Sequence, residues 1–127
     1  MKKLILATFI AQTLFADPEL YFIEPKDGSE QAGPVVIKFG LRDFGVAPAG
    51  YNIPNTGHHH LIIDAELPNL ELPIPANNNY VHFGLGQTET TINLEPGIHT
   101  LRLLMGNYLH IPHTEPIYSK EITITVK

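Results

Sequence analysis

The amino-acid sequence predicts an all-β protein, an immunoglobulin-like antiparallel β-sandwich of about seven strands. Short apolar runs rich in β-branched and aromatic residues recur along the 127-residue chain. Clusters of Pro, Gly and Asn separate these runs, and 11 prolines with 10 glycines leave few stretches long enough for a helix. The chain has neither cysteine nor tryptophan, so the Cys…Trp…Cys core of antibody domains is excluded and only the architecture is expected to be shared.

The first three expected strands lie in the N-terminal half of the chain. Residues 20–23 are a short apolar run that ends at Glu24-Pro25 and a turn containing Gly28. Residues 34–41 are rich in Val, Ile and Phe, which favour strands. Residues 58–65 follow an Asn-Thr-Gly turn and join three consecutive histidines to an apolar end.

The four remaining strands are expected in the C-terminal half. Residues 80–85 and 88–94 are short runs on either side of a glycine-containing turn. Residues 98–105 follow the turn Pro96-Gly97 and alternate clearly between apolar and polar positions. Residues 116–126 are expected to form the last strand. Their apolar positions are Ile117, Ile122, Ile124 and Val126.

A Pro-rich connection at residues 66–79 precedes the fourth strand. Apolar side chains alternate along it with polar or proline residues: Leu67, Leu70, Leu72 and Ile74. We expect the connection to place these side chains on the sandwich as an irregular edge. The alternative is a groove that binds a partner.

The N-terminus has the pattern of a secretory signal peptide. Lys2 and Lys3 precede an uncharged stretch at residues 4–15, and the small residue Ala16 precedes Asp17. The apolar stretch is shorter than the roughly 20 residues that span a bilayer. We therefore expect a signal peptide at residues 1–16, one domain at residues 17–127, and a periplasmic or secreted protein that is not embedded in the membrane.

Composition narrows the chemistry of the expected mature chain. Loss of Lys2 and Lys3 leaves 6 basic residues against 13 acidic ones, a formal net charge of −7. Such a surface repels phosphate backbones, so nucleic-acid binding is disfavoured. Because cysteine is absent, disulfides, thiolate metal sites and a cysteine nucleophile are excluded.

Histidine is the chemical feature that stands out, with seven in the chain. Neutral imidazole is the commonest protein ligand for borderline transition metals. Side chains alternate faces along a strand, so His58 and His60 share a face about 6.5–7 Å apart, a spacing at which two imidazoles converge on one ion. The sequence leaves open whether that face points outward or is covered by a loop.

The other histidines are candidates for completing a site. His82 lies in another short strand, and His110 and His113 lie in one loop. Asp64 shares the face of His58 and His60 and is a candidate to orient an imidazole from behind the ligands. His99 shares a face with the apolar side chains of its strand, so we expect it to be a core histidine bonded to a backbone carbonyl.

The order of several segments resembles a bacterial family of short exported proteins, domain-of-unknown-function family 4399. These segments are GVAPAG (45–50), NTGHHHLIID (55–64), HFGLGQTET (82–90), PGIHTL (96–101) and HIPH (110–113). The resemblance implies an exported β-sandwich domain and no particular reaction. It places Gln87 with the histidines in the signature segments, as a further candidate behind the ligands. Leu85 stands where the family pattern suggests glycine, which makes it less expected that the backbone of residues 82–90 binds a ligand.

These observations favour a metal-binding module for copper(II) or zinc. Its expected ligands are His58 and His60, with His82, His110 or His113. The alternative is a module without metal that binds an envelope protein or glycan. Catalysis is not expected, because Ser29 and Ser119 lack the surroundings of a nucleophile. A metal-dependent hydrolase would need Asp64 or Glu66 beside the ion.

Overall fold

The protein is described here by a computed structural model that covers residues 1–8 and 16–127. Most of the apolar stretch of the predicted signal peptide, residues 9–15, lies outside the described residues. Within the described ranges, no helix is long and apolar enough to cross a membrane. Those ranges contain nine strands and no helix, which confirms the all-β prediction. The strands are β1 (Glu19–Glu24), β2 (Glu30–Gln31), β3 (Val35–Arg42), β4 (Gly45–Val46), β5 (Thr56–Ile63), β6 (Tyr80–His82), β7 (Glu89–Ile92), β8 (Gly97–Gly106) and β9 (Ile122–Val126).

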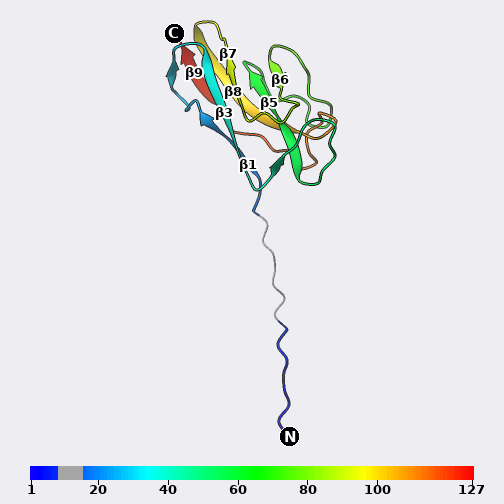
Figure 1. The fold of residues 1–127 in the computed structure, drawn as a ribbon. Helices are drawn as coiled ribbons and strands as arrows, with labels where there is room; N and C mark the ends of the chain where they lie inside the picture. The colour runs from blue at the N-terminus through cyan, green and yellow to red at the C-terminus, as the bar shows by residue number, and fades with distance from the viewer. Residues whose placement is uncertain (9–15) are drawn as a thin grey trace.

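The strands form two sheets that pack face to face (Figure 1). One sheet has the order β1-β3-β7, and the other has the order β2-β9-β8-β5-β4, with β6 also paired to β5. All pairs are antiparallel except β2–β9 and β4–β5. These two parallel pairs involve the two-residue strands β2 and β4, which are too short to show a sequence period and account for the difference between seven expected strands and nine.

The main core lies between the sheets. It is built from alternate residues of each strand, as expected for a sandwich. Phe39 of β3 belongs to this core with Leu61 and Ile63 of β5, and the core members from β5 and β8 have at most 7% of their surface exposed. The buried members are Leu20, Val35, Ile37, Phe39, Leu61, Ile63, Phe83, Leu101, Leu103, Met105, Ile117, Ile122, Ile124 and Val126.

The opposite face of β5 is buried as well. Ile62 packs with Leu104 of β8 and with Ile74 from the Pro-rich connection. Leu67 and Leu70 pack against this second cluster, whereas Leu72 is exposed. The connection therefore covers the outer face of the larger sheet, and every residue from His58 to Ile63 is buried.

The last expected strand is shorter than the sequence suggested. Residues 116–126 were expected to be continuous, but β9 begins at Ile122. The chain still runs beside β8 before that point, where the amide of Met105 donates to the carbonyl of Ile117 and the amide of Ser119 donates to the carbonyl of Leu103. The Ser119 hydroxyl accepts from the amide of Leu103 and donates to the carbonyl of Lys120, which bends the chain out of the ladder.

Candidate metal centre

His58 and His60 are presented by the central strand β5. Alternation along the strand directs both side chains to the outer face of the larger sheet, while His59 points between the sheets. His58 stands opposite Gly106 of β8, and His60 stands between Leu104 of β8 and His82 of β6. Both imidazoles have 0% of their surface exposed, because the Pro-rich connection and the loop after β8 cover this face.

His110 reaches the same face from the loop that follows β8. Its backbone adopts φ +62°, a left-handed conformation that costs a non-glycine residue free energy unless its surroundings fix it. Asn107 fixes this turn, since its side-chain oxygen accepts from the amides of Leu109 and Ile111. The carbonyl of His110 in turn accepts from the amide of Ile74, which attaches the loop to the Pro-rich connection.

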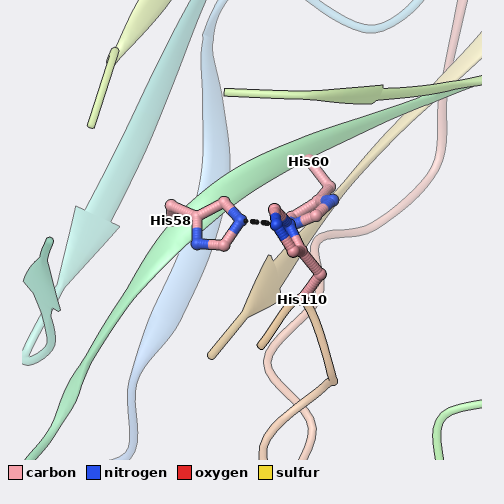
Figure 2. A group of neighbouring side chains, drawn as sticks. All are labelled: His58, His60 and His110. Carbon is pink, nitrogen blue, oxygen red and sulfur yellow. Dashed lines mark hydrogen bonds between the residues drawn. The ribbon is translucent and has the colours of Figure 1, made fainter. Parts of the chain in front are cut away.

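Three ring nitrogens converge on one point (Figure 2). Nε2 of His58 lies 2.9 Å from Nε2 of His60 and 3.0 Å from Nδ1 of His110. One ligand nitrogen from each of the three residues lies within 4.8 Å of the others. We call His58, His60 and His110 the histidine triad.

Hydrogen bonding alone does not satisfy this arrangement. An imidazole nitrogen has one in-plane site, which either carries a proton or accepts one. Nε2 of His58 faces two other ring nitrogens and can form a well-aligned hydrogen bond with one of them. A metal ion placed between the three nitrogens would use all three lone pairs at once. Coordination of a metal ion would therefore satisfy the three ring nitrogens better than hydrogen bonds among the rings do.

The triad is uncharged at neutral pH. Burial lowers the pKa of His58 to about 4, and it lowers the pKa of His60 and of His110 as well. Repulsion from neighbouring histidines lowers each of these pKa values further. Neutral imidazole is the form that binds metals, so at pH 7 no imidazolium has to lose its extra proton before an ion binds.

His82 adjoins the triad without belonging to it. Its ring centroid lies 4.1 Å from that of His60 and 4.8 Å from that of His110, and it stacks on the His110 ring. Its Nε2 donates to the carbonyl of Pro75 at 2.8 Å. A histidine that binds a metal usually donates its other ring nitrogen to a carbonyl or carboxylate in this way. His82 therefore has the hydrogen bond typical of a metal ligand, although its ring lies beside the triad.

His113 is turned away from the triad. Its Nε2 donates to the carbonyl of Thr56, and its ring packs edge-on against Phe44. The surface pocket that His113 lines also includes Asp17, Asp43 and Glu115 and includes none of the triad.

Two side chains expected behind the ligands have other partners. Asp64 was expected to orient an imidazole of the cluster, but its carboxylate binds Nδ1 of His99 and the amide of Thr100. The chain turns at Asp64, which has φ +52°, so the side chain no longer follows the face of His58 and His60. The Gln87 side chain accepts from the amide of Leu85 within its own turn, where Leu85 is exposed.

His99 forms separate polar contacts, with Asp64 and Glu95, away from the triad. Its Nε2 donates to the carbonyl of Glu95 at 2.6 Å, which is the expected kind of bond, and its Nδ1 lies 2.6 Å from Asp64. The expected place in the core is wrong, because the side chain is 13% exposed and lies outside the core cluster. The bond to Asp64, with the bond to Glu95, raises the pKa of His99. With an acceptor at each nitrogen, the protonated ring is the form that the folded state favours.

We expect Asp64→Asn to destabilise the protein by about 1 kcal/mol at pH 6, since the bond lies at the surface, and by less at pH 9. A His with a raised folded-state pKa contributes stability below its unfolded pKa and loses it as the pH rises through the folded pKa. Asn tolerates the positive φ of this position. Urea unfolding of both proteins at the two pH values measures the difference. An equal difference at both pH values would show that the His99 ring is not charged when it is bonded to Asp64.

Gly106 is a positioning residue that the sequence did not reveal, since the expected strand ended one residue before it. A Cβ on Gly106 would lie 2.5 Å from Nε2 of His60, so the ring can occupy its place only beside glycine. The one signal in the sequence was a glycine directly after an expected strand. The pairing of that strand with the strand that carries the histidines is not visible in the sequence.

The fold and the triad define a β-sandwich domain with a buried histidine cluster that could hold a metal ion. The model of the family described as "Domain of unknown function (DUF4399)" matches residues 37–127, and the chain belongs to this family. All seven histidines lie within the matched residues.

A solved structure with a similar fold is the endo-beta-1,4-mannanase from Thermotoga petrophila. It shares 17% identity with this chain at a TM-score of 0.51, and the match covers 88% of this chain but 20% of the mannanase chain. At this identity the similarity concerns the fold alone. A search of curated proteins gives no match.

Proposed function

We propose that this protein is an exported metal-binding module that takes up copper(II) or zinc through His58, His60 and His110. The observation that carries the proposal is the convergence of three ring nitrogens, with Nε2 of His58 at 2.9 and 3.0 Å from the other two. Imidazole-only coordination suits zinc and copper(II). Sulfur ligands are not expected, because the chain has no cysteine, Met1 belongs to the predicted signal peptide, and Met105 is buried in the main core.

The role that fits this site is that of a carrier or buffer. No carboxylate belongs to the triad, and Asp64 is bonded to His99, so the general base that a metal hydrolase needs has no candidate there among the described residues. The predicted signal peptide supports a place in the periplasm or outside the cell, where the protein would hold an ion and pass it to an envelope protein.

Calorimetric titration with copper(II) and with zinc tests the proposal, using protein without a polyhistidine tag. We expect one ion per chain and a Kd in the micromolar range or tighter. His110→Ala should weaken binding about tenfold, or about 1.4 kcal/mol, because it removes a ligand. The matched control is His113→Ala, from the same loop, which should change the Kd by less than about threefold (0.6 kcal/mol).

Two results would contradict the proposal. One is the absence of binding of either ion to folded protein, which would favour a module that binds an envelope protein or glycan. The other is equal loss of affinity in the two variants, which would show that binding does not depend on the triad.

A further inference from the structure

We propose that the metal-loaded triad takes a small monovalent anion as an additional ligand of the ion. This inference rests on the proposed function and concerns the same site. It assigns to the protein a second ligand class, anions of the size of chloride, azide or formate, that would bind only when the ion is present.

The first argument is the charge balance of the site. The three ligands are imidazoles, and the side chain that packs against two of them on this face is a further imidazole, His82. A divalent ion would therefore keep its full +2 charge beside two ligands with 0% exposure. Uncompensated charge in such surroundings is strongly unfavourable, and an anion bound to the ion would halve it.

The second argument is the open coordination position. Three protein ligands leave at least one position of a four-coordinate ion for an outside ligand. His58 and His60 close the site from the sheet, where Gly106 lies against the ring of His60. His110 and His82 are only partly buried, so the open position faces outward past these two rings. These two rings stack on each other, with centroids 4.8 Å apart, and so crowd the outer side of the site, which favours a small ligand over a large one.

His82 is the competitor for this position. It flanks the triad, but its Nε2 donates to the carbonyl of Pro75, and it is not among the residues whose ligand nitrogens converge. To bind the ion, the ring would have to move toward the triad. Because the protein holds this ring in place through Pro75, we assign the open position to the anion.

Cobalt(II) is the probe, because its visible d–d spectrum reports coordination at a site that otherwise holds zinc. The full chain is loaded with cobalt(II) in a buffer without halide and titrated with sodium azide and, separately, with sodium chloride. His82→Ala is titrated in parallel. Calorimetry of zinc binding with and without azide gives the coupling between the two ligands.

We expect d–d bands on loading, a saturable shift of these bands with azide in wild type and in His82→Ala, and zinc affinity at least about fivefold tighter with saturating azide. Bands that appear but do not respond to azide in wild type would overturn the anion and leave the metal site standing. Bands that respond to azide only in His82→Ala would assign the position to His82 instead. Absence of bands, together with absence of zinc binding, would overturn the proposed function and this inference together.

Discussion

The free energy of unfolding should fall by several kcal/mol between pH 7 and pH 4, with His59 responsible for roughly 3 kcal/mol of the loss. His59 points between the two sheets, with its ring 4.9 Å from that of Phe39 and 0% of its surface exposed. Burial, followed by the charge of His58, lowers its pKa from 6.5 to about 4.

The direction follows from proton uptake. Between pH 6.5 and about 4 the unfolded chain binds a proton at position 59 that the folded chain does not bind. Stability is therefore complete above pH 6.5 and is lost as the pH falls toward 4. His58 and His60 act in the same direction, because burial lowers their pKa values too.

His59→Leu separates the contribution of His59 from theirs. Neither ring nitrogen of His59 has a hydrogen-bond partner among the residues that the structure describes, so a leucine of similar volume removes two unsatisfied polar atoms from the core. We expect the variant to be about 1–3 kcal/mol more stable at pH 7 and to lose less stability on acidification. Urea unfolding at pH 4, 5, 6 and 7 measures both effects.

The control for His59→Leu is metal binding. Because His59 faces away from the triad, the variant should bind copper(II) or zinc with the affinity of wild type. A variant that is less stable at pH 7, or an unchanged pH dependence, would show that His59 has partners in solution that relieve its burial.

The positions of the strands were predictable because they depend on local patterns. Period-two alternation and Pro, Gly or Asn at the turns located all seven longer strands, including β8 with its alternating apolar side chains. The faces of β5 were not predictable. Ile62 lies on the same face as His58 and His60, so alternation alone could not show that the Pro-rich connection at residues 66–79 folds back and covers that face.

The site was partly predictable for the same reason. The placement of His58 beside His60 follows from strand geometry alone, and the structure brings these two together. The third member of the triad depends on a loop. His110 and His113 are three residues apart, and the left-handed backbone at His110, held by Asn107, decides which of them reaches β5. Asp64 was misplaced because its own positive φ ends the alternation that the sequence suggests.

Gly106→Ala should weaken copper(II) or zinc binding about 10- to 100-fold, the range seen when a residue behind a ligand is changed. A Cβ at this position would meet Nε2 of His60 at 2.5 Å and its Cδ2 at 3.1 Å. The imidazole would have to rotate, and its ligand nitrogen would leave the point where the triad converges. Overpacking of a buried position also costs about 1–3 kcal/mol of stability.

Gly84→Ala is the matched control, since its added Cβ would meet only the Cβ of Ala49, at an ordinary 3.5 Å. Calorimetric titration gives the affinities, and urea unfolding of the metal-free proteins shows whether each variant is folded. If Gly106→Ala is folded and binds the ion as tightly as Gly84→Ala does, His60 does not ligate through Nε2. The triad would then have to bind an ion through a different set of ring nitrogens from the three that now converge. The positioning role assigned to Gly106 would be wrong.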